Sequence, residues 1–339
     1  MNANMAEGHH SSKSSNSEVI TVIPVYNGEK YLQATLESVA RQTRRPDRLL
    51  IIDDGSTDGT EELVRAFKDI PCEWHPNPQN LGLFPNLNKA LEKANEAEFF
   101  HLLLADDLVV PEFIETSCLA LSDASPLSFS WSDIQWINAE GRHTKGTVFD
   151  SGRPGAPFSQ RTFLTKESEL QTVSVGSVMI RTGRKPLPCC FRTDLPQVAD
   201  CVFYGELASH AKSLIHIPRP LCHIRTHATN MTSKNIQNLK AWVTDEWIAM
   251  QETAQRIEEN FLQKWLRQQK LKCLYAARSK VKEQWMEKNQ PDYAQQIRHA
   301  ARSTLPLPHF LLGRMSVLLR DMIKGRNVAT KKMEGQVPP

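Results

Sequence analysis

Two pairs of adjacent aspartates in this sequence follow apolar runs and are suited to binding a polar ligand or a cation. The pair Asp53–Asp54 ends an apolar run over residues 49–52, and the pair Asp106–Asp107 follows residues 99–104, which are apolar apart from His101. Runs without a polar face predict strands buried on both sides, as in parallel sheets. Ligands of open α/β sheets bind beyond the carboxyl ends of the strands, so these pairs indicate contacts to a ligand such as a nucleotide. A simple Asx turn with a helix cap is the alternative interpretation.

Helices are expected after the strands, where they would fix the strand ends. Asp58 and Glu61 have the spacing of a helix N-cap and its capping partner. A further apolar run over residues 19–23 precedes Asn27, which could cap a second helix. The apolar positions of that helix recur at helical spacing: Leu32, Leu36 and Val39. The resulting β-α-β-α order favours an α/β fold with a parallel, doubly wound sheet.

The middle of the chain gives weaker signals. A helix is predicted over residues 85–94, beginning at Pro85, and strands over 127–137, 173–180 and 215–217. Residues 144–158 are rich in glycine and proline and predict a mobile loop. We hypothesise that this loop closes over bound substrate.

Composition limits the class of protein. A chain of 339 residues with 40% hydrophobic content can bury a full core, and a net charge of +3 is too small to indicate nucleic-acid binding. The seven cysteines form no C-x-x-C pair and are expected to be reduced and intracellular. No apolar segment has the pattern of a signal peptide or of a spanning helix, so a soluble or membrane-peripheral protein is expected.

Four motifs in a fixed order carry a family resemblance. They are Val-Ile-Pro-Val-Tyr-Asn-Gly at residues 22–28, Ile-Asp-Asp-Gly-Ser-Thr-Asp-Gly-Thr at 52–60, Asn80-Leu81-Gly82 with Asn88, and Leu-Leu-Ala-Asp-Asp-Leu at 103–108. Together they resemble the family 2 glycosyltransferases, strongly over residues 19–111 and more weakly to 232. The resemblance implies a Rossmann-like GT-A domain with a mostly parallel central sheet. It also implies inverting transfer of a sugar from a nucleotide diphosphate, usually with a divalent metal.

The resemblance assigns a set of donor-binding residues. Pro24 and Tyr26 match positions that line the base pocket, and Asp54 matches the position that accepts a hydrogen bond from the uracil ring, which implies a UDP-sugar donor. Asn27 and Asn80 match positions near the donor. Core packing for Tyr26 and turn chemistry for Asn80 are the alternatives.

The resemblance also places a metal site. Asp107 matches the position that ligates Mg²⁺ or Mn²⁺, and Asp106 the position that meets the donor ribose or sugar. Hard cations of this kind take oxygen ligands, few of them from protein. Arg225 and His227 match a basic segment near the diphosphate, and His227 is assigned to the metal. Many family members carry an acid where this chain has Leu104, which puts the affinity for metal in doubt; a plain acidic turn is the alternative.

A general base is expected at the start of a later helix. Asp200 matches the family position and would take the proton from an acceptor hydroxyl. Asp194 and Glu206 are the rival candidates. A helix cap is the structural alternative for Asp200.

Beyond residue 235 the composition changes. Apolar residues recur at near-helical spacing and predict long amphipathic helices that pack on the catalytic domain: Trp242, Trp247, Ile248, Ala254, Ile257, Phe261, Trp265 and Leu266. From residue 235 to the end, 18 Lys and Arg less 10 Asp and Glu give a net charge of about +8. Residues 310–324 predict a helix on an anionic membrane surface, with the protein's own domain or a partner subunit as alternatives.

These observations give a domain order and a function. The predicted order is a disordered tail (1–17), the GT-A domain (18–234), a helical region (235–325) and a second disordered tail (326–339). The predicted activity is transfer of a sugar from a UDP-sugar to a glycan or lipid-linked glycan in surface or extracellular polysaccharide synthesis, in the cytoplasm or on the inner face of the membrane. A nucleotidyltransferase would need a phosphate loop that residues 24–28 lack. A non-catalytic scaffold with a degenerate nucleotide-sugar site is the second alternative.

Overall fold

The computed structural model describes residues 17–147, 158–228, 230–231 and 235–323. Nearly all of the predicted N-terminal tail, the C-terminal tail and residues 148–157 of the predicted loop lie outside the described residues.

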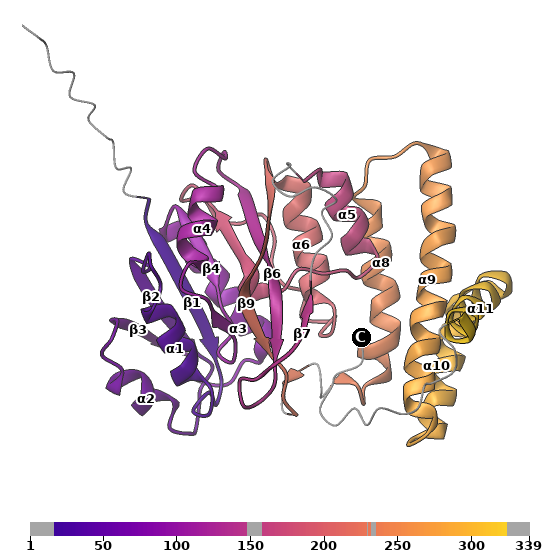
Figure 1. Cartoon of the computed structure of the whole chain (residues 1–339), viewed down its shortest axis with the longest axis horizontal. Coiled ribbons are helices and arrows are strands. Elements are labelled where there is room, and N and C mark those ends of the chain that lie inside the picture. Colours follow the sequence, from indigo (N-terminus) through magenta and orange to yellow (C-terminus); the bar gives the residue numbers. More distant parts are fainter. Residues whose placement is uncertain (1–16, 148–157, 229, 232–234, 324–339) are drawn as a thin grey trace, which may run out of the picture.

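One sheet forms the centre of the molecule (Figure 1). Its strand order is β3-β2-β1-β4-β8-β6-β9-β5, with β7 paired to β6. Strands β1 to β4 are mutually parallel, β6 and β9 run in the same direction, and β5, β7 and β8 run in the opposite one. The mostly parallel α/β sheet is therefore confirmed. The strands are β1 (Val19–Val25), β2 (Arg48–Asp53), β3 (Cys72–Pro76), β4 (Phe99–Leu102), β5 (Leu108–Val109), β6 (Ser128–Ile137), β7 (His143–Thr147), β8 (Val178–Arg181) and β9 (Leu214–Arg225).

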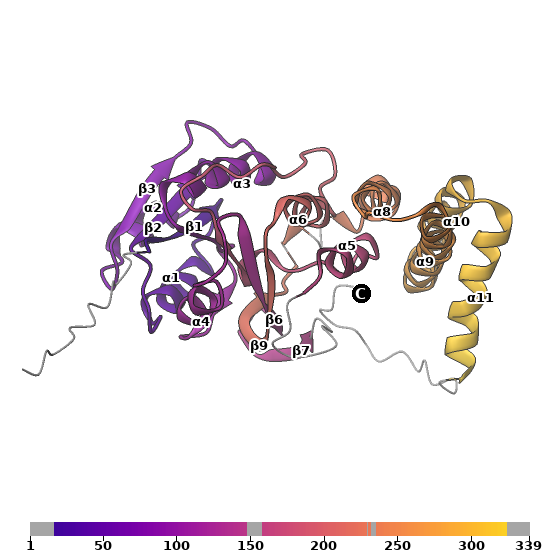
Figure 2. The ribbon, with the colours of Figure 1, turned by 90° about the horizontal axis from the view of Figure 1, so that it is seen from above.

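Helices cover both faces of the sheet, as the apolar strands require. One face packs against α1 (Leu32–Ala40), α2 (Thr60–Ala66) and α4 (Phe113–Ala120). The other face packs against α3 (Leu83–Leu91), α5 (Gln160–Ser168) and α6 (Ala199–His210). Figure 2 shows α3 and α6 on one side of the strands and α1 and α4 on the other.

Helix α2 begins at Thr60, where the sequence predicts it, but several details of the predicted helix starts are wrong. The residue before α2 is Gly59, and Asp58 instead accepts a hydrogen bond from the Thr60 N–H at 3.2 Å. Asn27 does not cap α1, whose N-cap is Tyr31. Two residues of α3 precede Pro85, and the helix ends in a 3₁₀ turn, η1 (Glu92–Glu96).

The later strands also differ from their predicted bounds. Residues 175–177 form a 3₁₀ turn, η2 (Val175–Ser177), and only β8 of the predicted 173–180 segment is extended. The short strand predicted at 215–217 is part of β9, which continues to Arg225 because it pairs with β6 over most of its length. Strand β7 occupies the start of the predicted loop.

The C-terminal region is helical, as predicted, but only part of it packs on the sheet domain. A π-helical turn, η3 (Lys240–Thr244), leads into α8 (Asp245–Gln255), which packs against α5 and α6. Beyond it, α9 (Phe261–Glu287) packs with α10 (Pro291–Thr304) and α11 (Leu307–Ile323) around a further core, to which η3 and α8 also contribute. The predicted packing of Phe261, Trp265 and Leu266 on the catalytic domain is wrong, because these side chains are exposed. Since α8 shares a small core with α6, the boundary at residue 235 stays a prediction.

Among the described residues, no helix is both long enough and apolar enough to cross a lipid bilayer.

Candidate active site

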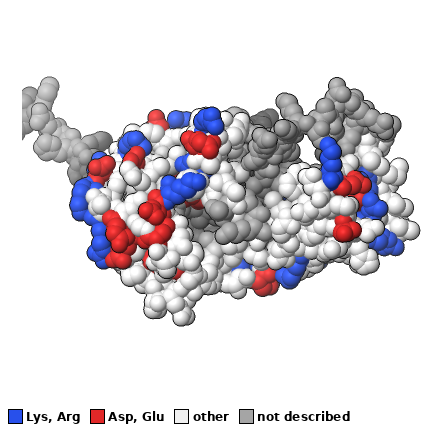
Figure 3. All heavy atoms as spheres, turned by 90° about the horizontal axis from the view of Figure 1, so that it is seen from below, with Lys and Arg blue, Asp and Glu red and all other residues white. Residues whose placement is uncertain are grey.

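The carboxyl ends of the co-directional strands meet at one edge of the sheet. Strands β1, β2, β4, β6 and β9 run in the same direction, so the residues that follow them gather at that edge. The edge lies at the bottom of Figure 1 and faces the viewer in Figure 3, where acidic and basic side chains lie side by side over the N-terminal half. Helix α6 leads within a few residues into the start of β9, so its N-terminus, with Asp200, points toward the same edge. The topology thus brings the acids after β2 and β4 and the basic residues at the end of β9 to one edge.

Asp54 fixes the loop beneath the expected base pocket. Its buried carboxylate accepts hydrogen bonds from Asn77 Nδ2 and from the backbone N–H groups of Leu81 and Gly82, each at 2.9 Å. The Gly82 N–H is shared with Asn80 Oδ1, also at 2.9 Å, and Gly82 has φ 92, which favours glycine. Three donors stabilise the Asp54 charge, and no cationic side chain pairs with it among the described residues. Asp54 and Asn80 therefore shape the loop at the donor position.

Asn27 joins the turns after β1 and β2. It has φ 51, its N–H donates to Ser56 Oγ at 2.8 Å, and its Oδ1 accepts from the Thr57 N–H at 2.9 Å. Pro24 is buried within β1, whereas the Tyr26 side chain is 51% exposed. An exposed aromatic ring at a ligand-binding edge is available to stack on a base.

The second acidic pair is held by β9. Asp107 is buried, and its Oδ1 accepts from the Arg225 N–H at 2.9 Å. Burial and the charge of Asp106 raise the pKa of Asp107 well above its usual value. Gly176 lies beside this carboxylate, where a Cβ would sit 3.8 Å from Asp107 Oδ2 and closer still to Leu103. The backbone thus comes close to a carboxylate whose Oδ2 has no hydrogen bond among the described residues.

His227 and Arg225 surround Asp106. His227 Nε2 is 2.9 Å from Asp106 Oδ2. The Arg225 side chain donates from Nε to the Asp106 carbonyl at 2.8 Å and from Nη1 to the Asn138 and Ala139 carbonyls. The guanidinium is therefore held by backbone oxygens and is buried, which the sequence did not indicate.

Tyr31 is a site residue that sequence reasoning missed. Its ring lies 4.9 Å from the Arg225 guanidinium and 4.7 Å from the His227 ring. The contact aligns the two basic residues by cation–π and ring packing. Nothing in the sequence marks Tyr31, because it lies far from β9 along the chain.

The donor set suits a hard cation, though it is small. Among the described residues, no three His, Cys, Asp or Glu side chains group as a metal site. Asp107, Asp106 and His227 nevertheless lie next to one another, and Mg²⁺ commonly takes one or two carboxylates with substrate phosphate and water. A buried carboxylate with an oxygen that has no hydrogen bond among the described residues fits this requirement.

Asp200 has the properties of a base, and its rivals do not. Burial raises the pKa of Asp200 to about 6, while its Oδ1 accepts from the Cys201 N–H at 2.8 Å. Asp194 is paired with Arg192 at 2.6 Å, which lowers its pKa to about 2. Glu206 is paired with Arg256 at 3.3 Å. Asp200 is thus the one of the three candidates without a cationic partner among the described residues.

Glu167 is a buried neighbour that the sequence did not reveal. Its side chain is fully buried on α5, and burial with the charge of Asp200 raises its pKa well above the usual value. A glutamate in a polar helical segment gives no sequence signal of burial. Two acids of raised pKa therefore lie near each other at the start of α6.

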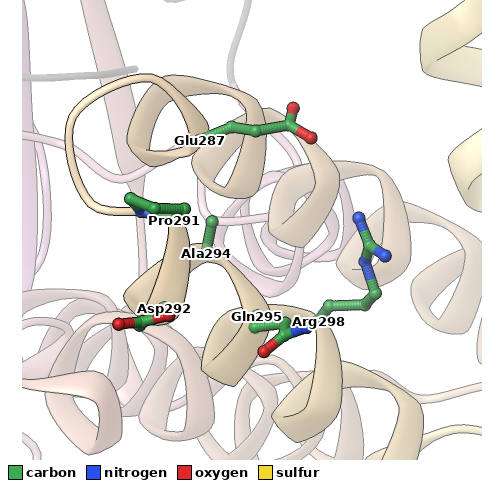
Figure 4. A pocket seen from close by; sticks show the side chains of 6 residues that line it. All are labelled: Glu287, Pro291, Asp292, Ala294, Gln295 and Arg298. Carbon is green, nitrogen blue, oxygen red and sulfur yellow. The ribbon is translucent and has the colours of Figure 1, made fainter.

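A hollow lies away from this edge, where α9 ends and α10 begins (Figure 4). Its lining residues are Glu287, Pro291, Asp292, Ala294, Gln295 and Arg298. Arg298 also pairs with Glu283 at 2.5 Å. None of the predicted site residues lines the hollow, and we assign it no role.

Comparisons with known proteins agree with the geometry. Residues 20–182 match the family described as glycosyl transferase family 2. The chain is 26% identical over 256 residues to the putative glycosyltransferase EpsH of Bacillus subtilis, covering 71% of this chain and 70% of the relative. It is 34% identical over 97 residues to an uncharacterized glycosyltransferase of Rickettsia typhi, covering 29% of this chain and 30% of that protein. The sequence comparisons support glycosyl transfer as the activity.

Solved structures share the fold at low sequence identity. S. aureus TarS 1–349, solved in complex with UDP-GlcNAc, has a TM-score of 0.56 and 14% identity, over 89% of this chain and 92% of that one. The mannosyltransferase PcManGT from Pyrobaculum calidifontis, solved with GDP-Man and Mn²⁺, has a TM-score of 0.53 and 17% identity, over 89% and 80%. These matches establish the fold alone.

Proposed function

We propose that this chain, whose residues 20–182 match family 2 glycosyl transferases, moves a sugar from a UDP-sugar to an acceptor hydroxyl with inversion at the anomeric carbon. The observation that carries the proposal is the contact between the acids that follow β4 and the end of β9: Asp106 lies against His227, and Asp107 accepts from the Arg225 N–H. The acceptor would be a glycan or a lipid-linked glycan of the cell surface, with the protein in the cytoplasm or at the inner face of the membrane.

The donor would lie across the ends of β1 and β2. Tyr26 would stack on the uracil ring above buried Pro24. Asp54 would accept a hydrogen bond from the imide N–H of uracil, which cytosine lacks. It would keep the hydrogen bonds that it accepts from the Leu81 and Gly82 N–H groups. Asn27 and Asn80 would keep the two turns in place around the nucleotide. The structure relatives that contain UDP-GlcNAc, UDP and GDP-Man support a nucleotide-sugar donor.

Asp107 and His227 are the residues that would hold Mg²⁺ or Mn²⁺, with Asp106 directed to the donor ribose or sugar. The bound ion would supply positive charge that stabilises the departing diphosphate. Arg225 would add its own charge from behind the site, since its guanidinium is fixed by backbone carbonyls and the Tyr31 ring.

Asp200 would act as the general base. It would take the proton of the acceptor hydroxyl while the acceptor oxygen forms the new bond to the anomeric carbon and the bond to the diphosphate breaks. UDP leaves, and the proton stays on Asp200 until solvent removes it. Attack from the face opposite the leaving group gives inversion.

A non-catalytic nucleotide-sugar-binding scaffold is the second candidate. Leu104 occupies the position where many family 2 enzymes have an acid, and it packs against the core rather than contributing a ligand. This reading predicts donor binding without turnover.

Release of nucleotide from a panel of UDP-, GDP- and dTDP-sugars distinguishes the two. We expect slow hydrolysis of one UDP-sugar with Mn²⁺ or Mg²⁺, and its loss with EDTA and in Asp107→Ala, because Asp107 is the proposed ligand. Asp58→Ala is the matched control, since Asp58 is an acid of the same edge that accepts from the Glu29 N–H and from the Thr60 N–H at the start of α2, and it is not a proposed metal ligand. Donor-induced stabilisation without turnover, in the presence of candidate acceptors, would support the scaffold. Equal turnover in Asp107→Ala would refute the proposed metal site.

A further inference from the structure

Large apolar side chains are exposed on two helices at the end of the molecule far from β3 (Figures 1 and 2). In the first turns of α9 they are Phe261, Leu262, Trp265 and Leu266, each between 51% and 87% exposed. On α11 they are Leu307, Leu311, Leu312, Met315, Leu318 and Leu319, each between 48% and 57% exposed. In the rest of the described chain only Tyr26 and Leu119 are comparable.

The two sets lie on helices that pack against each other. Helix α11 packs on α9 at Gly313, where an added Cβ would collide with the Cys273 carbonyl and with Ala276, and His309 Nε2 lies 2.6 Å from Gln269 Oε1. Trp265 lies one helical turn before Gln269, on the same stripe of α9. We call the exposed side chains of the first turns of α9 and of α11 the α9–α11 surface.

Helix α11 is apolar on both sides. Phe310 and Val317 are buried on the side that faces α9, while the opposite side carries the exposed leucines. A helix that is apolar all round is normally covered on every side. The described residues of the sheet domain do not cover these side chains, which are exposed among the residues that the structure describes.

The α9–α11 surface carries an excess of positive charge. Segments 261–272 and 302–319 contain no Asp or Glu and six basic residues: Lys264, Arg267, Lys270, Lys272, Arg302 and Arg314. Three of the six pair with carboxylates from outside the segments, at Glu259, Glu169 and Glu283. Lys264, Lys272 and Arg302 have no ion pair among the described residues. The surface is therefore both apolar and cationic.

We propose that the α9–α11 surface binds an anionic lipid bilayer. The leucines and Trp265 would enter the boundary between headgroups and acyl chains, and Lys264 and Lys272 would lie at the lipid phosphates. A symmetric dimer through the same face would bring like charges together, because the surface would meet itself. The proposal does not depend on the proposed catalytic function. If the acceptor is lipid-linked, membrane binding would place the active site close to it.

Vesicle sedimentation of the full chain tests the proposal. We expect binding to vesicles that contain about a third phosphatidylglycerol in phosphatidylcholine, weak binding to phosphatidylcholine alone, and release by high salt. Lys264→Gln with Lys272→Gln should weaken binding roughly 25-fold, from about fivefold for each charge removed. The triple variant Leu312→Ser, Met315→Ser, Leu319→Ser should lose most of the remaining affinity for lipid, since it removes apolar contact.

Leu119→Ser is the matched control, because Leu119 is 67% exposed on α4, away from this surface. It should bind vesicles as the unaltered chain does. All variants should keep their melting temperature and donor hydrolysis, which separates this test from that of the catalytic proposal. Absence of binding to anionic vesicles, or equal binding by the triple variant, overturns the proposal. The proposal is also overturned if light scattering shows that the unaltered chain is a dimer and that the triple variant is a monomer.

Discussion

The pKa of Asp200 gives the sharpest test of the proposed mechanism. A carboxylate acts as a base only when ionised, and burial raises the pKa of Asp200 from 3.8 to about 6. With a pKa of about 6, the ionised fraction is about 90% at pH 7 and about 9% at pH 5. An ordinary carboxylate would still be more than about 90% ionised at pH 5. The rate of transfer should therefore fall roughly tenfold between pH 7 and pH 5, with the loss on the acid side.

The assay is kcat/KM for transfer across this pH range, with the melting temperature measured at each pH to exclude unfolding. Asp200→Asn removes the base and should lower kcat by about 10² to 10⁴, with little pH dependence in what remains. Asp194→Asn is the matched control, because Asp194 is held ionised by Arg192 and should be dispensable for proton transfer.

Three results would refute this reasoning. They are a flat wild-type profile down to pH 5, an acid limb that persists unchanged in Asp200→Asn, and equal damage from Asp194→Asn. In Asp200→Asn, the rate of donor hydrolysis should fall less than the rate of transfer. Asp200 is proposed to take the proton of a bound acceptor hydroxyl, and attack by water does not require that placement.

Two further variants probe stability and alignment. Glu246→Gln leaves the buried Lys282 and the partly buried Arg278 without their carboxylate and should cost about 3 kcal/mol in urea unfolding. Because these cations lower the pKa of Glu246 to about 2, its contribution is complete above pH 4.5 and should be lost as the pH falls toward 2. Tyr31→Leu removes the ring beside Arg225 and should lower kcat/KM about tenfold, with little change in melting temperature.

The controls for these variants are exposed groups. Glu37→Gln breaks a surface pair with Arg41 and should change the free energy of unfolding by less than about 0.5 kcal/mol. If Glu37→Gln lowered the free energy of unfolding as much as Glu246→Gln, the burial of the Glu246 pair would not explain its larger expected effect. Unchanged kinetics in Tyr31→Leu would show that the aromatic contact does not align the basic residues.

The sheet half of the fold could be predicted from local sequence. Uninterrupted apolar runs such as residues 49–52 have one favourable environment, a strand buried on both faces, and the acids after them mark the strand ends. Helix starts were less predictable. Asn27 is a good capping residue in isolation, but its φ of 51 and its bonds to Ser56 and Thr57 come from the neighbouring turn.

Features that depend on distant segments could not be predicted. From the sequence, Arg225 is expected to be a cation free to contact a ligand. In the structure it lies at the end of β9, and its side chain donates to the carbonyls of Asp106 and Asn138. Glu167 reads as a surface acid until α6 packs over it. The spacing of Trp265 and its neighbours correctly predicted a helix, but periodicity does not specify which surface an apolar stripe contacts.

The close packing of α11 on α9 at Gly313 also bears on the orientation that the protein would take on a membrane. A methyl group at this position would meet the backbone of α9 at Cys273, so any longer residue must push the two helices apart. Because α11 carries much of the proposed lipid-binding face, such a shift would tilt that face relative to the sheet edge that holds Asp107 and Asp200. The lack of a side chain at Gly313 would thus help to set the angle between the catalytic edge and an acceptor anchored in the same bilayer.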